Sequence, residues 1–315
     1  MKRKFLLLIF MMVVVAMQAA NNPTVKVVYN GAEAAVTIDD DIAEYITVNS
    51  GTSSHVSITS STESVEIIYD LSGSSDDGEF ILNGDYKCEI DLNGLTLTNP
   101  SGPALNIQNG KRIDVSAKKN TVNTLTDGKN ANYKGCIHCT GHLEFKGKGE
   151  LNIVGNSKHA IFSDEYVEIK NLTLNITGAV KDGIHCKQYF LMESGTVTIS
   201  NVGDDGIQCE LAGETSTGEL VGHENEEQNE DSGNVYQLDG TLTIQDFGGK
   251  AIKADGEIFY RGGTQNFDTS QTTGITAVMT SEPSKDSAVY DLSGRRVTEP
   301  SRGIYIQNGK KYVVK

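Results

Sequence analysis

A short motif recurs six times along the 315-residue chain, and it restricts the folds that the chain can adopt. In each copy, a Gly, Ala or Cys precedes an aliphatic residue. The six aliphatic residues are Leu105, Ile137, Ile161, Ile184, Ile207 and Ile252. They are separated by 32, 24, 23, 23 and 45 residues in turn. A period near 23 residues therefore runs through the centre, with insertions in the first and last intervals.

A second pattern lies between the copies of the first. It alternates apolar and polar residues, as a strand with one buried face does. Its copies are LTLT (95–98), LNIV (151–154), LTLN (172–175), VTIS (197–200) and LTIQ (242–245). Further short strand-like pieces, such as LEF and VEI, lie between the two patterns. Each coil of about 23 residues therefore contains about three short strands.

Three short strands in each coil predict an all-β fold of the parallel β-helix type. Successive coils pair with one another, and alternate side chains form inward ladders. A single coil cannot bury its apolar face alone, so several stacked coils are required. We expect six to seven of them, roughly between residues 86 and 266. A β-propeller would need longer repeats, and a leucine-rich repeat protein would contain far more Leu.

The rest of the chain divides around this predicted β-helix at 86–266. Residues 1–20 have the basic start, apolar run and small residues of a signal peptide, which predicts an extracellular or outer-surface location. The apolar run is too short to cross a bilayer, so no membrane insertion is expected. The other predicted parts are an N-terminal β cap or first coils at 21–85, a polar loop insertion at 211–234, a linker at 267–288 and a small C-terminal β tail at 289–315.

The charge balance excludes some classes of partner. The chain has 27 basic and 42 acidic residues, a formal net charge of −15. Nucleic-acid binding requires a basic surface, so no nucleic-acid partner is expected. An acidic polysaccharide could bind such a chain only through local basic groups or a bridging cation.

Three of the five cysteines follow the repeat. Cys139, Cys186 and Cys209 each come two residues after a repeat Ile, so they are expected to point inward. There they would act as small apolar filler. A disulfide between Cys186 and Cys209, on neighbouring coils, is the alternative.

Aromatic and imidazole side chains recur at outward positions of the coils. Three of them directly follow a repeat Ile, and three come five residues after one. Coils stack about 4.8 Å apart, which approaches the length of one sugar unit. Flat rings with polar tips suit sugar faces and hydroxyls. The candidate carbohydrate-binding residues are therefore His138, His142, Phe162, Tyr166, His185 and Tyr189. The alternative is that these rings stack only to tighten the turns.

A group of aspartates precedes two of the repeats. Asp182 and Asp205 are 23 residues apart and should stack, and Asp204 adjoins Asp205. Carboxylates this close repel one another unless a cation or a hydrogen bond intervenes. Oxygen ligands in a turn favour Ca²⁺, so these three residues form a candidate calcium site. In the alternative, the side chains cap backbone N–H groups in the turns.

Signs of catalysis are weak. The chain has no GxSxG, HExxH, Walker or Rossmann pattern. A calcium-dependent polysaccharide lyase would need a base near the ion, and Lys181 beside Asp182 could supply it. A structural or adhesive surface protein is a third interpretation.

The turns GDDGIQC (203–209) and KDGIHC (181–186) between TLTI-like strands resemble a bacterial family of carbohydrate-binding domain proteins. The stretches 93–112 and 141–156 share the likeness, which covers about 25–266. The resemblance implies a right-handed, pectate-lyase-like β-helix that binds polysaccharides such as cellulose and pectin without established lyase activity. It also implies Ca²⁺ at the DGI turns, which points to Asp182, Asp204 and Asp205.

The C-terminal tail carries a second resemblance. YDLSGRRV and GIYIQNGKKYVVK are similar to the sorting domains of proteins exported by the type IX route. This implies the export machinery as a partner. The sequence as a whole predicts an exported, non-catalytic polysaccharide-binding β-helix protein, with Ca²⁺ as its candidate cofactor.

Overall fold

The computed structural model describes residues 22–211 and 231–268, and near the C-terminus 289–291, 296–298, 303–307 and 310–314. The helix found in these parts of the chain is the short 3-10 helix η1 (Asp40–Tyr45). No helix there is long and apolar enough to cross a membrane. The predicted signal peptide, most of the loop insertion at 211–234 and the linker from residue 269 onward lie outside the described residues.

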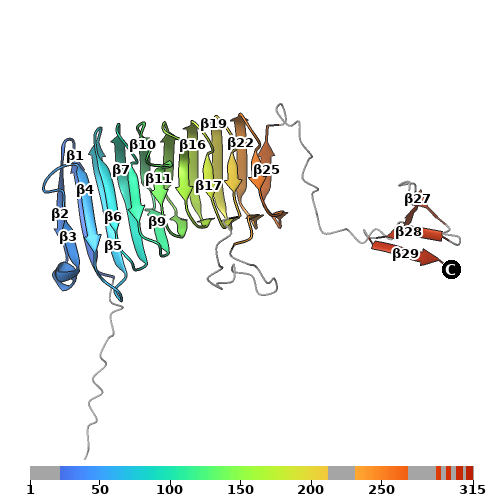
Figure 1. The fold of residues 1–315 in the computed structure, drawn as a ribbon, viewed down its shortest axis with the longest axis horizontal. Helices are drawn as coiled ribbons and strands as arrows, with labels where there is room; N and C mark the ends of the chain where they lie inside the picture. The colour runs from blue at the N-terminus through green and yellow to red at the C-terminus, as the bar shows by residue number, and fades with distance from the viewer. Residues whose placement is uncertain are drawn as a thin grey trace, which may run out of the picture.

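Most strands stack in parallel along one direction, from β1 in blue to β25 in orange (Figure 1). Along the chain, three consecutive strands contribute in turn to three faces, which we call sheets 1, 2 and 3. Sheet 1 contains β9 (Ile113–Ala117), β12 (Leu143–Gly147), β15 (Val167–Ile169), β18 (Tyr189–Met192), β21 (Asn234–Gln237) and β24 (Ile258–Tyr260). Sheet 2 contains β10 (Val122–Asp127), β13 (Glu150–Gly155), β16 (Leu172–Ala179), β19 (Gly195–Val202), β22 (Thr241–Phe247) and β25 (Thr264–Phe267).

Sheet 3 contains β4 (His55–Ser60), β6 (Glu79–Asn83), β8 (Leu105–Gln108), β11 (Gly135–Cys139), β14 (His159–Ser163), β17 (Ile184–Cys186), β20 (Ile207–Cys209) and β23 (Ile252–Ala254). From β11 onward, each strand of sheet 3 follows a strand of sheet 2 along the chain and precedes the next strand of sheet 1. Sheets 1 and 2 are joined near the N-terminal end by the long strand β7 (Cys88–Asn99). Its first half pairs with β9 and its second half with β10. This many-stranded parallel arrangement confirms the all-β prediction, whereas the coil length and the right-handed sense stay predictions.

The repeat aliphatic residues form one ladder through sheet 3. Ile137 pairs with Ile161, Ile161 with Ile184, and Ile184 with Ile207. Leu105 and Ile252 extend the same row at its two ends. Because every second residue of these strands points inward, the row runs through the apolar core between the three sheets.

The cysteines lie in the same core. All five are buried and unpaired in the part of the chain that the structure describes. Cys186 and Cys209 are direct register partners on β17 and β20, and they are not joined by a disulfide. This agrees with small apolar filler rather than with the disulfide alternative.

The first strands close one end of the stack. β1 (Thr24–Asn30) pairs in parallel with β5 (Ile67–Ser75) and antiparallel with β2 (Glu33–Ile38). β3 (Ile46–Val48) pairs antiparallel with β4 at the corresponding edge of sheet 3. A separate four-stranded antiparallel sheet comprises β26 (Val289–Asp291), β27 (Arg296–Val297), β28 (Gly303–Gln307) and β29 (Lys310–Val314).

Candidate functional site

The turns that lead from sheet 2 to sheet 3 gather three carboxylates. Asp182 follows β16, and Asp204 and Asp205 follow β19 one coil further on. Their ligand oxygens all lie within 4.8 Å of one another. Asp182 and Asp205 are buried, while Asp204 is partly exposed. The structure therefore brings together the three residues proposed from the sequence as a calcium site.

Two of these carboxylates also cap the turn of the next coil. Asp182 Oδ1 accepts a hydrogen bond from the N–H of Asp205 at 3.0 Å. Asp205 Oδ1 accepts one from the N–H of Lys250 at 2.7 Å. Asp127 makes the same kind of contact with the N–H of Asn156. The capping alternative is therefore present in the structure, and each capped oxygen retains a second lone pair for other partners.

The charges around the three carboxylates favour the binding of a cation. Burial raises the pKa of Asp205, and the nearby charges of Asp182 and Asp204 raise it further. The ammonium groups of Lys181 and Lys253 lie 3.5 Å from Asp204 and 3.7 Å from Asp205. Both lysine side chains are about half exposed, so solvent weakens this compensation. The carboxylate set thus has the oxygen donors that Ca²⁺ prefers.

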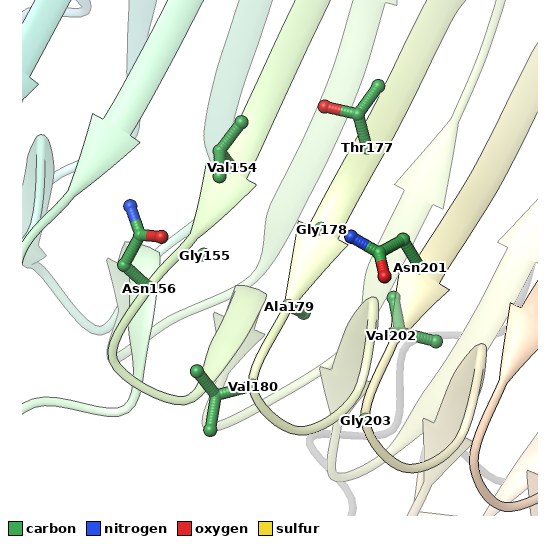
Figure 2. Close-up of a pocket in the computed structure, with 10 residues that line it drawn as sticks. All are labelled: Val154, Gly155, Asn156, Thr177, Gly178, Ala179, Val180, Asn201, Val202 and Gly203. Carbon is green, nitrogen blue, oxygen red and sulfur yellow. The ribbon is translucent and has the colours of Figure 1, made fainter.

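A hollow lies at the same corner of the molecule (Figure 2). It forms where a register irregularity between Ile153 and Val154 interrupts the pairing of β13 with β16. It is lined by Val154, Gly155, Asn156, Thr177, Gly178, Ala179, Val180, Asn201, Val202 and Gly203. Val180 and Gly203 directly precede Lys181 and Asp204, so the hollow and the carboxylates share the same turns. Apolar walls beside amide and hydroxyl groups suit a sugar ring.

The six ring residues predicted to bind carbohydrate form two stacks. In one, Phe162 lies between His138 and His185, with ring centroids 5.5 and 5.3 Å apart. In the other, Tyr166 lies between His142 and Tyr189, at 4.3 and 4.5 Å. The neighbouring coils therefore align these rings as the sequence spacing predicted.

The faces of these rings are covered in the structure, and carbohydrate binding by the six residues stays a prediction. Every one of the six is buried, with between 1% and 8% of its surface exposed. The stacked rings cover one another's faces, and acidic side chains cover their polar tips. Tyr166 donates to Glu144 at 2.9 Å, and Tyr189 donates to Glu168 at 2.6 Å. This arrangement favours the alternative in which the rings tighten the turns.

A row of carboxylates that the repeat patterns did not predict lies on the outer face of sheet 1. The residues pair directly from strand to strand in the order Glu89, Asp114, Glu144 and Glu168. Lys146 compensates part of this charge, at 3.3 Å from Glu89 and 2.5 Å from Asp114. The signal was present as an acidic residue in the middle of the strand segments CEI, IDV, LEF and VEI.

Lys181, the candidate base of a lyase, lies on the surface. More than half of its side chain is exposed, and its ammonium group faces Asp204. Lysines that act as bases are commonly buried, and this solvated, ion-paired position lacks that burial.

Comparison with known proteins identifies the family. A family model described as carbohydrate-binding domain-containing protein matches residues 51–311. The chain belongs to this family. Among solved structures, a polysaccharide lyase-like protein from C. thermocellum, solved as a gadolinium derivative, matches with 18% identity and a TM-score of 0.59. The match covers 76% of this chain and 99% of that one, and at this identity it shows the fold alone. No curated protein matches the chain.

Proposed function

We propose that this member of the carbohydrate-binding domain family is a non-catalytic module that binds polysaccharide at the corner between sheets 2 and 3. The observation that carries this proposal is the hollow beside the three carboxylates Asp182, Asp204 and Asp205. A bound Ca²⁺ at the carboxylates would attract sugar hydroxyl oxygens and also the carboxylates of an acidic polysaccharide, and the net charge of −15 would otherwise repel those carboxylates.

The hollow supplies the remaining contacts in this proposal. Val154 and Val180 offer apolar surface to the C–H face of a sugar ring. Asn156 and Asn201 can donate to and accept from its hydroxyls. The ring stack of His138, Phe162 and His185 follows the turns of this corner on sheet 3 and would hold them in place. The stack that contains His142 and Tyr189 lies at the next corner, where sheet 3 leads into sheet 1.

The proposal includes export and the details of the coil. We infer that residues 1–20 direct the chain out of the cytoplasm and that the tail at 289–315 engages the type IX export machinery. We also infer a right-handed, pectate-lyase-like coil. The family membership and the lyase-like neighbour support polysaccharide binding, and the basic start and apolar run of residues 1–20 support export.

The decisive experiment measures retention of the purified chain on a panel of plant and microbial polysaccharides, with Ca²⁺ and with a chelator. Asp204→Asn is the informative variant, because Asp204 is the least buried member of the cluster. Asp76→Asn, an exposed residue far along the stack, is the matched control. We expect retention that is lost in chelator and weakened in Asp204→Asn but not in Asp76→Asn.

Absorbance of unsaturated products is followed in the same assay. Product formation that is lost in Lys181→Ala would replace the binding module with a calcium-dependent lyase. Absence of retention on every polymer would leave a structural or adhesive surface protein.

A further inference from the structure

Two histidines and an aspartate converge at the corner turns of β14 and β17. His159 opens β14, Asp182 lies in the next coil at the same register, and His185 is the central residue of β17. One ligand atom from each of the three lies within 4.8 Å of the other two. Their side chains are 12%, 2% and 10% exposed, so the group is shielded from solvent.

The distances suit a small cation. Nδ1 of His159 lies 3.1 Å from Oδ2 of Asp182, and Nδ1 of His185 lies 2.8 Å from the same oxygen. Around Zn²⁺, with bonds of about 2.0–2.2 Å, tetrahedral ligand atoms lie roughly 3.4 Å apart. An ion would therefore fit between the three donors after side-chain shifts of a few tenths of an ångström.

The surroundings orient His185 as a metal ligand is oriented. Nε2 of His185 lies 3.4 Å from Oε2 of Glu210, and Gln208 holds the other oxygen of Glu210 at 2.8 Å. In metal sites a carboxylate commonly accepts the N–H of one ring nitrogen of a ligand histidine, and the other ring nitrogen binds the metal. Glu210 lies where such a carboxylate would lie, and Nδ1 of His185 faces Asp182.

Nδ1 of His159 faces both the backbone N–H and the carboxylate of Asp182. The N–H of Asp182 points at Nδ1 of His159 at 3.3 Å, so this nitrogen acts as an acceptor. A cation bound here would replace these contacts, since imidazole nitrogens and a carboxylate oxygen are all ligands of Zn²⁺.

We propose that His159, Asp182 and His185 bind a divalent transition-metal cation such as Zn²⁺, and that Glu210 positions His185. Imidazole nitrogen suits Zn²⁺ and its neighbours, whereas Ca²⁺ selects oxygen ligands. The site uses Oδ2 of Asp182, while Oδ1 faces Asp205 and the proposed calcium cluster. It does not depend on carbohydrate binding.

The test is a titration of the chelator-treated chain with Zn²⁺ by calorimetry, in the presence of excess Ca²⁺. We expect one tight equivalent in the unaltered protein and an increase in its melting temperature. His159→Ala and His185→Ala should each weaken binding on the order of 100-fold, and Glu210→Gln on the order of tenfold. His55→Ala is the matched control, because His55 also contacts two carboxylates but lies on β4.

Circular dichroism of each variant establishes that it is folded. If His185→Ala does not fold, His159→Gln and Glu210→Gln carry the test. Zn²⁺ binding of equal strength in the folded variants, or no binding by the unaltered protein, would overturn the assignment. Polysaccharide retention is also measured with a zinc-selective chelator. This measurement distinguishes failure of the metal-site proposal from failure of the glycan-binding proposal.

Discussion

Glu168 illustrates how the fold alters the chemistry of a single residue. It lies in the outward carboxylate row of sheet 1, next to Glu144, and accepts a hydrogen bond from Tyr189 at 2.6 Å. Burial raises the pKa of Glu168 from 4.5 to about 7, and the charges of Glu144 and Glu193 add to the shift. Its ionised form is therefore poorly tolerated in the folded state.

This pKa predicts how stability varies with pH. Because the folded-state pKa of Glu168 exceeds the unfolded-state value, the folded protein binds more protons between them, and stability falls as pH rises from about 5 to 8. In Glu168→Gln, the decrease in the free energy of unfolding between pH 5 and pH 8 should be smaller by about 2 kcal/mol. Urea unfolding at pH 5 and pH 8 measures it, with the exposed Glu44→Gln as control. Equal pH dependence in Glu168→Gln and the unaltered protein would contradict the prediction.

Gly147 is required by backbone conformation and by close packing. Its φ of +109° is one that other residues rarely adopt, and an added Cβ would lie 2.1 Å from the carbonyl oxygen of Ala117. Gly147→Ala should destabilise the protein by about 2 kcal/mol or more. Gly110→Ala, where nothing lies within 4 Å, should have little effect. Similar unfolding midpoints for the two variants would argue against a strained contact at Gly147.

At the scale of elements, the short strands of sheet 3 depend on their partners. β17 and β20 each contain three residues, too few to be stable alone. Their inward side chains supply the stability by stacking on the equivalent residues of neighbouring coils. By contrast, the outward side chains of the same strands stack as rings or form ion pairs with one another.

The inward row of aliphatic residues predicts that a cavity within it would lower the free energy of unfolding substantially. Ile184 is fully buried between Ile161 and Ile207, so Ile184→Ala should lower the free energy of unfolding by about 2–5 kcal/mol. Val122→Ala on β10 removes apolar atoms from a residue that is 59% exposed, and should change it by less than about 0.5 kcal/mol. Chemical denaturation compares the two, and a small effect at Ile184 would mean that the coils can collapse around the cavity.

At the scale of the whole molecule, a stack of coils has two ends that could pair with another chain. At the N-terminal end, β1 and β2 form a hairpin whose residues Val25, Val27 and Tyr29 are buried in the core. This hairpin covers the edge of β5. An uncovered parallel edge would present unpaired backbone groups and apolar side chains to other molecules.

The cap predicts an effect of truncation. Deleting residues 22–38 should expose the edge of β5, lower the unfolding temperature and promote self-association. Light scattering and size-exclusion chromatography measure the association, and thermal unfolding measures the stability. A monomeric truncated chain with an unchanged unfolding temperature would show that β5 needs no cover.

The sequence by itself determined the all-β class, the direct pairing of the repeat aliphatic residues and the proximity of Asp182 to Asp205. These follow from periodicity, because residues one coil apart become neighbours when parallel strands stack. Only the tertiary structure decided that the rings of Phe162 and Tyr166 are buried, since stacking distances and covering acids are not encoded in spacing. The proximity of His159 to His185 likewise could not be predicted from the sequence. These two residues occupy different repeat positions, and only the bend of the turns brings both to Asp182.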